Sequence, residues 1–237
     1  MSTPFSLNSN FINGGICAAV AAQNVQSVIA SVLPFIDAID VVEVRLDAMR
    51  QINIQELCDA INLPLLFTNR PAWEGGAFTG HEQDRVHSLV DAVQHQAAFV
   101  DLELKTDLHL RARLLQEMEG SHTRLIISHH NFDKTPGSES LSQTLRQQAE
   151  SGAHIGKIVT MAHDHFDVLR VLNLQNDAKE LKFPLIAFCM GEAGRLSRII
   201  TLLLGGFMTY AALDDNHATA PGQLSIKQIK TSLSLLA

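Results

Sequence analysis

Short runs of aliphatic and β-branched residues alternate along the chain with longer segments whose apolar residues recur at helical spacing. A run of about four to eight such residues predicts a buried strand, and apolar positions three and four apart predict an amphipathic helix. The predicted strands are Gly15–Ala21, Val41–Arg45, Leu65–Asn69, Phe99–Leu104, Leu125–Ser128, Lys157–Met161, Leu185–Met190 and Phe207–Ala211. The predicted helices are Asn24–Ile36, Ile54–Ile61, Gly80–Gln96, Leu108–Glu117, Leu141–Ser151, His165–Asn173, Arg195–Leu203 and Ser225–Leu236. Each predicted strand is therefore followed by a predicted helix.

Eight strand–helix units within 237 residues predict an α/β fold, the (β/α)8 TIM barrel, whose usual length is about 250 residues. No linker or low-complexity stretch interrupts the alternation, so we expect residues 1–237 to form one catalytic domain. An open doubly wound sheet is the alternative, although no Gly-x-Gly-x-x-Gly follows the first predicted strand to support its dinucleotide-binding form. In a barrel, catalytic side chains lie at the carboxyl ends of the strands.

The composition fits a folded domain and excludes several classes of partner. Hydrophobic residues make up 46% of the chain and charged residues 18%, a profile unlike that of disordered or fibrous proteins. Lysine and arginine number 18 against 25 aspartate and glutamate, so the net charge of −7 disfavours binding to nucleic acid or anionic membranes. The longest apolar stretches, such as Leu63–Phe67 and Phe183–Met190, are far shorter than the roughly 18 residues that span a bilayer.

The amino terminus and the cysteines point to a reducing compartment. Residues 1–8 lack the cationic start and apolar segment of a secretory signal, so we expect the protein in the cytoplasm. Cys17, Cys58 and Cys189 are too few and too scattered for a disulfide framework, and they show no metal-ligand spacing. We expect them to be small buried residues.

The second predicted strand carries an ionisable face. Strict alternation places Glu43, Arg45 and Asp47 on one side of the strand and the aliphatic residues on the other. This face is either a structural ion-pair cluster or the polar floor of an active site, because buried charges need partners. The fourth predicted strand repeats the pattern with Asp101, Glu103 and Lys105. Its carboxylates would balance inward-facing cations within a buried network.

A lysine lies in the otherwise apolar sixth strand, in the run Gly156-Lys157-Ile158-Val159. Lysine is rarely buried without a partner or a purpose. Loss of hydration, together with arginine neighbours, would disfavour its ammonium form and expose a nucleophilic amine. Lys157 is therefore a candidate for a Schiff base. In the alternative interpretation it only starts the strand and reaches solvent.

Polar residues also follow the third and fifth predicted strands. Arg70 ends the third strand, and Glu74 follows it next to Gly75 and Gly76, which permit close approach of the backbone. The fifth strand ends in Ser128-His-His130-Asn-Phe, where an imidazole could exchange protons near neutral pH. With 11 histidines in the chain, a purely structural role is the alternative, and His129 would point away from His130.

Two further segments could bind an anion or cover a ligand. The turn Gly191–Gly194 precedes a helix whose first N–H groups attract negative charge, and Arg198 could grip a carboxylate in bidentate fashion. A surface salt bridge is the alternative for Arg198. After the eighth strand, the polar loop from Asp214 to Gln223 is of a kind that closes over bound ligands.

Six motifs in order along the chain resemble one known family. They are Glu43-Val-Arg45-Leu-Asp47, Thr68-Asn-Arg70 with Glu74-Gly-Gly, Ser128-His-His130-Asn-Phe, Gly156-Lys157-Ile, Met190-Gly through Ser197-Arg198, and Ala220-Pro-Gly-Gln223. With them the chain resembles type I 3-dehydroquinate dehydratase, the Schiff-base-forming barrel lyase of the shikimate pathway that serves aromatic amino acid biosynthesis. The resemblance implies dehydration of 3-dehydroquinate to 3-dehydroshikimate without a metal or organic cofactor, and a homodimer.

The resemblance also implies a role for each matching residue. Lys157 would form the iminium with the substrate ketone, His130 would act as general base and acid, and Glu74 would orient and tune His130. Arg198 would hold the substrate carboxylate. The remaining positions that line the pocket in that family are Glu43, Arg45, Arg70, Thr219 and Gln223. Thr219 stands where the family commonly has serine, so the hydroxyl is kept and a methyl group is added.

Three other functions are compatible with parts of the pattern. A class I Schiff-base aldolase would also use a lysine on the sixth strand, with the Gly191–Gly194 turn as a phosphate cradle. A metal-dependent barrel hydrolase could be built around His163 and His165. A non-catalytic barrel could bind a hydroxy acid, although the lysine, histidine and glutamate set argues against it.

Overall fold

The computed structural model describes residues 14–215 and 218–236, and within them the predicted alternation of strands and helices is present. The strands are β1 (Gly15–Val20), β2 (Val41–Arg45), β3 (Leu65–Thr68), β4 (Phe99–Glu103), β5 (Arg124–Asn131), β6 (Ile155–Met161), β7 (Leu185–Met190), β8 (Met208–Ala212) and the short β9 (Leu224–Ser225). The helices are α1 (Val25–Val32), α2 (Ile54–Ala60), α3 (Glu82–Gln94), α4 (Leu108–Glu117), α5 (Ser138–Glu150), α6 (His165–Glu180), α7 (Ser197–Leu203) and α8 (Ile226–Leu236).

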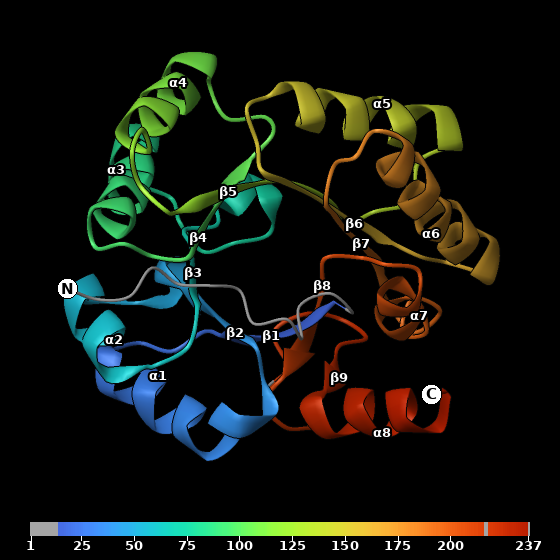
Figure 1. Cartoon of the computed structure of the whole chain (residues 1–237), viewed down its shortest axis with the longest axis horizontal. Coiled ribbons are helices and arrows are strands. Elements are labelled where there is room, and N and C mark those ends of the chain that lie inside the picture. Colours follow the sequence, from blue (N-terminus) through green and yellow to red (C-terminus); the bar gives the residue numbers. More distant parts are fainter. Residues whose placement is uncertain (1–13, 216–217, 237) are drawn as a thin grey trace.

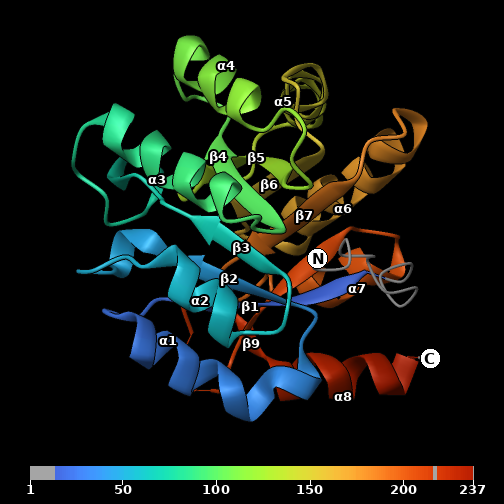
Figure 2. The same cartoon turned by 60° about the vertical axis from the view of Figure 1, so that its left-hand side comes forward.

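All strand pairs are parallel, and the hydrogen-bonded order is β7-β6-β5-β4-β3-β2-β1-β8-β9. The run closes where β7 and β8 meet, because the N–H of Phe207 donates to the carbonyl of Leu185 at 2.9 Å. Figure 1 shows the helices following one another around the outside of the strands, and Figure 2 shows the strands enclosed between them. The predicted (β/α)8 barrel is confirmed, and the open sheet is excluded.

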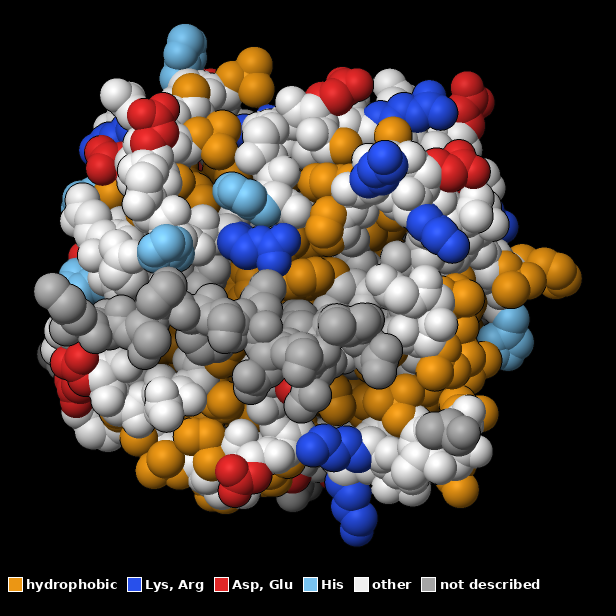
Figure 3. All heavy atoms as spheres, viewed as in Figure 1, with side chains coloured by type: hydrophobic (Ala, Val, Ile, Leu, Met, Phe, Trp, Pro, Cys, Tyr) orange, Lys and Arg blue, Asp and Glu red, His pale blue; other side chains and the backbone are white. Residues whose placement is uncertain are grey.

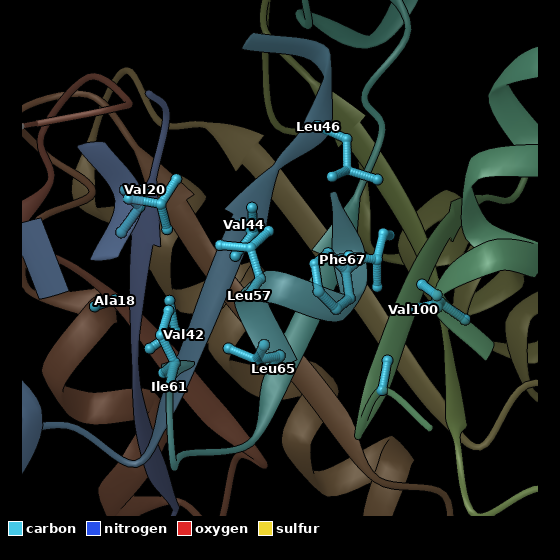
Figure 4. Packing of buried hydrophobic residues seen from close by; sticks show 14 of the residues in the cluster. Ala18, Val20, Val42, Val44, Leu46, Leu57, Ile61, Leu65, Phe67 and Val100 are labelled. Atoms are coloured by element: carbon cyan, nitrogen blue, oxygen red, sulfur yellow. The ribbon is translucent and has the colours of Figure 1, made fainter. Parts of the chain in front are cut away.

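The hydrophobic core lies between the barrel and its helices. On β2, Val42 and Val44 point outward and pack against α2 through Leu57, as Figure 4 shows. Burial of these aliphatic groups stabilises the layer by about 1.5 to 3 kcal/mol for each large side chain. Because side chains alternate along a strand, the same β2 sends Val41 and Glu43 into the barrel. The alternation that builds the core therefore also aims polar groups inward.

Several elements differ from the predicted bounds because of contacts distant in the sequence. β5 runs three residues past its predicted end, since His129, His130 and Asn131 pair with β6. α6 runs on to Glu180, because its second half buries apolar residues against β7. Short 3-10 helices occur at Leu33–Ala38, Leu46–Ala48 and Ala72–Glu74. Lys105 lies exposed beyond the end of β4, so its predicted place on the face of that strand is wrong.

The cysteine prediction holds in part. Cys17 and Cys189 are buried free thiols, as expected, whereas Cys58 is only half-buried. Burial raises the pKa of the Cys17 thiol well above its ordinary value, and that of Cys189 to about 11. The two buried thiols are accordingly protonated at neutral pH and pack as apolar groups.

The surface mixes charged and apolar groups. Figure 3 shows hydrophobic side chains gathered at the right-hand edge, where Figure 1 places α6 and α7. This α6–α7 patch consists of Phe166, Leu169, Leu196, Leu203 and Leu204, each more than half exposed. Within residues 14–215 and 218–236, no helix combines the length and the hydropathy that a membrane crossing requires.

Candidate active site

A cavity of about 100 Å³ opens at the carboxyl ends of the barrel strands. Its lining includes all of the residues that the resemblance pointed to, namely Glu43, Arg45, Arg70, Glu74, His130, Lys157, Arg198, Thr219 and Gln223. These side chains come from β2, β5, β6 and α7 and from the loops after β3 and β8. The fold therefore assembles one site from segments spread over most of the chain, as the geometry of such barrels requires.

Lys157 is the third residue of β6 and is only 3% exposed, so the interpretation that it reaches solvent is wrong. Its Nζ lies 3.0 Å from Asp101 Oδ2, 3.4 Å from Glu43 Oε1 and 3.0 Å from the hydroxyl of Tyr210. The charges in direct contact with the amine are thus negative. Arg70 is a neighbour of the amine, as expected, because it binds the same Asp101 Oδ2 at 2.9 Å, but none of the direct contacts of Nζ is an arginine.

The ionisable face of β2 divides into two parts. Arg45 and Asp47 form a bidentate ion pair, with Nε to Oδ1 at 2.8 Å and Nη2 to Oδ2 at 2.7 Å. Asp47 also accepts the backbone N–H groups of Arg70 and Ala77, so it ties the loop after β3 to β2. Glu43 instead faces Lys157 across the cavity. Asp47 lies past the end of β2, in the 3-10 helix Leu46–Ala48, so its predicted place on the face of the strand is wrong, and the strand itself supplies Glu43 and Arg45.

His130 is held by Glu74. Its Nδ1 lies 2.9 Å from Glu74 Oε2, and its ring stacks on Phe132 at 6.1 Å between centroids. Glu74 ends the 3-10 helix Ala72–Glu74, and Gly75 follows in the left-handed region with φ of 75°. A Cβ on Gly75 would lie 2.3 Å from the Phe132 ring, so the glycine is what lets that ring pack here. With Nδ1 engaged, Nε2 is the nitrogen that can reach a substrate.

Burial disfavours the charged forms of both partners in this pair. It raises the pKa of Glu74 to about 8, against the lowering effect of Arg70. Burial, with help from Arg70 and Lys157, lowers the pKa of His130 well below 6.5. The imidazole is therefore neutral at pH 7. Once Glu74 ionises, it accepts a hydrogen bond from the Nδ1–H of the neutral imidazole, which leaves the lone pair on Nε2 and makes that nitrogen a base.

His129 lies beside the same carboxylate but does not line the cavity. Its Nδ1 is 3.8 Å from Glu74 Oε1, and this oxygen has no hydrogen-bond partner among the described residues. Burial lowers the pKa of His129, and Lys105 lowers it further. His130, rather than His129, is the histidine placed for chemistry in the cavity.

Arg70 is fixed in the cavity wall by a buried network. Its guanidinium lies 2.9 Å from Asp101 Oδ2 and 2.5 Å from Glu103 Oε1, and it donates to Ser128 Oγ at 2.7 Å. Glu103 also binds Arg85, a fully buried residue of α3. The prediction that the β4 carboxylates balance inward-facing cations is confirmed. Since every charge in this network has a partner, the guanidinium is held in one orientation.

Arg198 is a buried cation whose hydrogen bonds go to backbone carbonyls. It is 1% exposed, and its guanidinium nitrogens lie 3.4 Å from the backbone carbonyls of Tyr210 and Pro221. Within residues 14–215 and 218–236, its Nε has no hydrogen-bond partner and no carboxylate forms a salt bridge with it. Burial lowers its pKa to about 10. The alternative of a surface salt bridge for Arg198 is wrong, because the residue is buried. A buried guanidinium in this position is suited to bind an anion.

The loop after β8 covers the cavity. Thr219 donates to Gln223 Oε1 through its backbone N–H at 2.6 Å and its hydroxyl at 3.1 Å. Pro221 accepts the N–H of Gly191 at 3.2 Å, and Gly222, with φ of 69°, packs so closely that a Cβ would lie 2.2 Å from the Gly191 carbonyl oxygen. Residues 216 and 217 of the predicted loop lie outside the described residues.

Two of the alternative functions lose support in this geometry. The N–H of Gly191 donates to Pro221, and that of Gly194 donates back to Gly191, so two of the four N–H groups of this turn are already engaged and are not available to a phosphate. His163 Nε2 contacts the carbonyl of Asp133 at 2.7 Å, and His165 opens α6. The described part of the chain contains no group of three His, Cys, Asp or Glu side chains able to hold a metal ion.

Sequence reasoning missed Tyr210 and the apolar part of the lining. The apolar lining includes Ala19, Phe132, Val159, Phe188 and Met190. Tyr210 is the one tyrosine of the chain, and it lies in the apolar run that predicted the eighth strand. A phenol is large and mostly apolar, so Tyr210 fits the apolar pattern of a buried strand and does not stand out as a polar residue. The alternation of side chains along β8 was the signal that could have placed Tyr210 on the inward face, facing the cavity.

Comparisons with known proteins find relatives over most of the chain. Residues 16–237 match the family described as Type I 3-dehydroquinase. A protein of Desulfotalea psychrophila named 3-dehydroquinate dehydratase is 39% identical over 215 residues, which are 91% of this chain and 95% of that protein. One of the same name from Methanococcus maripaludis is 34% identical over 221 residues, 93% of this chain and 99% of its own. A crystal structure of 3-dehydroquinate dehydratase from Geobacillus kaustophilus has a TM-score of 0.86 at 30% identity, covering 94% of this chain and 91% of that one.

Proposed function

Because the chain belongs to the type I 3-dehydroquinase family, we propose that it is a hydro-lyase that dehydrates 3-dehydroquinate to 3-dehydroshikimate through a Schiff base on Lys157. The observation that carries the proposal is the meeting, in one cavity, of a buried amine, a histidine–carboxylate pair and a buried arginine that has no counter-charge among the described residues. These three features match the ketone, the labile proton and the carboxylate of the substrate.

Arg198 binds the substrate carboxylate. A carboxylate accepts two hydrogen bonds from a guanidinium in a planar fork, and here it would also neutralise a buried charge. The polar residues of the lining would contact the substrate hydroxyls, namely Glu43, Arg45, Arg70, Thr219 and Gln223. The contacts to the carboxylate and to the hydroxyls together orient the substrate ring with its ketone toward Lys157.

Lys157 then condenses with the ketone. Its amine forms a C–N bond with the ketone carbon, the C–O bond breaks, and oxygen leaves as water, so that a protonated imine links substrate to enzyme. The iminium nitrogen withdraws electrons from the adjacent C–H bond more strongly than a ketone oxygen does. Because this nitrogen supplies the electron sink, we propose that the reaction uses no metal or organic cofactor.

His130 performs both proton transfers of the elimination. Its Nε2 removes the proton next to the iminium carbon, the electron pair of that C–H bond flows toward the iminium nitrogen, and the resulting enamine expels the hydroxyl. The imidazolium returns the proton to that oxygen, which departs as water. Glu74 stabilises the imidazolium through Nδ1 in the interval between the two transfers. Hydrolysis of the product iminium regenerates Lys157.

The decisive experiment traps the covalent intermediate. The protein is mixed with 3-dehydroquinate and borohydride, and the added mass is located by peptide mass spectrometry, while enone absorbance is followed in an untreated sample. We expect an adduct on Lys157 together with enone formation. Lys157→Ala should fold, form no adduct and lose turnover, whereas Lys179→Ala, an exposed lysine on α6, should behave as wild type. Enone formation by Lys157→Ala at the wild-type rate would refute the proposal.

We further propose one catalytic domain over residues 1–237, a cytoplasmic location and a homodimer. The described elements from β1 to α8 build a single barrel, which supports the first proposal. The α6–α7 patch supports the last, because apolar groups clustered on one face mark interaction sites. Light scattering should give twice the chain mass, and Leu203→Glu should halve it. A monomer at micromolar concentration would overturn the dimer.

A further inference from the structure

The hydroxyl of Tyr210 touches the amine proposed to react. Tyr210 lies on β8 with 5% of its surface exposed, and its Oη is 3.0 Å from Lys157 Nζ. The amine also lies 4.1 Å from the centre of the phenol ring, so the ring packs beside it as well. Two contacts from one side chain fix the position of the hydroxyl relative to Nζ.

Building on the Schiff base proposed above, we propose that Tyr210 is a further catalytic residue, which carries a proton between Lys157 Nζ and the substrate oxygen while the imine forms. The ketone oxygen is separated from Nζ by a single carbon once the C–N bond exists. A hydroxyl in contact with Nζ can therefore bridge both atoms, as donor to one and acceptor from the other.

The proton transfers involve three groups only, namely the amine of Lys157, the hydroxyl of Tyr210 and the substrate carbonyl. The neutral amine of Lys157 forms the C–N bond, and the electron pair of the carbonyl π bond moves to oxygen. Tyr210 gives its hydroxyl proton to that oxygen and takes one proton from the new C–N⁺H₂ group. A neutral carbinolamine and an unchanged phenol result. The same two transfers in reverse release the product ketone from its own carbinolamine.

The other two contacts of Nζ are less suited to this task. Asp101 also binds Arg70 at 2.9 Å and accepts the Ser128 hydroxyl at 2.6 Å. Burial alone would raise the pKa of Asp101, but the charges of Arg70 and Lys157 and the hydrogen bond from Ser128 lower it. A carboxylate so strongly stabilised is a poor proton acceptor and has no proton to give. Glu43 lies farther away at 3.4 Å.

The phenol, by contrast, keeps its proton. Burial and the charge of Glu43 raise the pKa of Tyr210 well above its ordinary value. A neutral hydroxyl can accept from an ammonium and donate to an amine, so it fits both protonation states of Nζ. The two carboxylates can only accept.

Imine formation must be measured apart from elimination, and His130→Ala separates them because this variant can form the imine but lacks the base for the next step. In that background, adduct trapped by borohydride during mixing with 3-dehydroquinate is followed by intact mass. Tyr210→Phe keeps the ring over Nζ and removes only the hydroxyl. The matched control is Thr209→Val, which removes a buried hydroxyl of the same strand that has no partner among the described residues.

We expect His130→Ala with Tyr210→Phe to accumulate adduct roughly 100-fold more slowly than His130→Ala alone, with the same final amount. His130→Ala with Thr209→Val should accumulate it at the His130→Ala rate. Equal rates in the Tyr210→Phe and Thr209→Val backgrounds would overturn the role of Tyr210 and leave the Schiff base intact. Absence of any adduct on Lys157 in the wild-type protein would instead overturn the Schiff base and the relay together.

Discussion

Replacement of Arg198 by methionine should weaken substrate binding without weakening the fold. A buried arginine is ordinarily costly to remove, because its partner charge is left behind. Arg198 has no such partner among the described residues, and burial lowers its pKa from its ordinary value to about 10. That lowering corresponds to roughly 3 kcal/mol against the charged form in the folded state. At pH 7, below both pKa values, the guanidinium is charged and this cost is fully present.

The methionine removes the cost and loses three modest contacts. The hydrogen bonds to the carbonyls of Tyr210 and Pro221 are long, at 3.4 Å, and contribute about 1 kcal/mol each. The guanidinium also lies over the Phe188 ring, 4.6 Å from its centroid, and this contact contributes about 0.5 to 1 kcal/mol. The balance is close to neutral, so we expect a Tm within a few degrees of that of the wild type. Methionine also fills most of the space of the arginine stem.

Substrate affinity should change in the opposite direction. Charge-assisted hydrogen bonds to a carboxylate contribute about 1.5 to 3 kcal/mol, so KM for 3-dehydroquinate should rise by roughly 10- to 100-fold. Enone absorbance gives KM, and thermal denaturation gives Tm. Arg195→Met is the matched control, since Arg195 pairs with Glu192 at the surface and should leave KM unchanged. A marked fall in Tm with KM unchanged would refute the assignment of Arg198 as the anion site.

Three further predictions concern the base and the covering loop. Since Glu74 has a raised pKa of about 8 and must be ionised to hold the Nδ1 proton of His130, kcat/KM should rise between about pH 7 and 9, and Glu74→Gln should abolish this rise. The same rise in Glu74→Gln would assign the titration elsewhere. His130→Ala should accumulate unreacted adduct on Lys157, and an intact-mass spectrum without it would contradict the base role. Gly222→Ala should lower kcat/KM by roughly tenfold at unchanged Tm, since alanine costs about 1 to 3 kcal/mol at that φ and meets the Gly191 carbonyl. Steady-state kinetics at wild-type values would mean that the loop accommodates the methyl group.

The strands and helices were predictable where their signal is local. β2 and β7 have the bounds that their apolar runs predict, because each run is confined by turn-forming residues. The extension of β5 was not predictable, since His130 belongs to a strand only through its pairing with Val159 on β6. From the sequence alone, polar residues at the end of a strand are assigned to a loop, because their pairing with the neighbouring strand is not known.

Most of the residues that line the site could be predicted from the sequence, but the charged groups that contact each of them could not. The motifs name Lys157, yet the carboxylates beside its amine come from β2 and β4, and no local pattern links them to β6. In the same way, Arg85 looks like an exposed helical residue, and only the fold buries it against Glu103. Tertiary packing decides which opposite charges meet.

The counter-charges of Lys157 also bear on how such a barrel can be divided. Asp101 and Glu43 belong to the first four strands, whereas Lys157 arrives with β6. A fragment that ended after β4 would enclose carboxylates that lack this cation, and a fragment that began at β5 would carry a buried ammonium without its anions. Each half would therefore contain buried charges without their partners. We expect neither half to fold stably alone, because the ion pairs at the cavity join one half to the other.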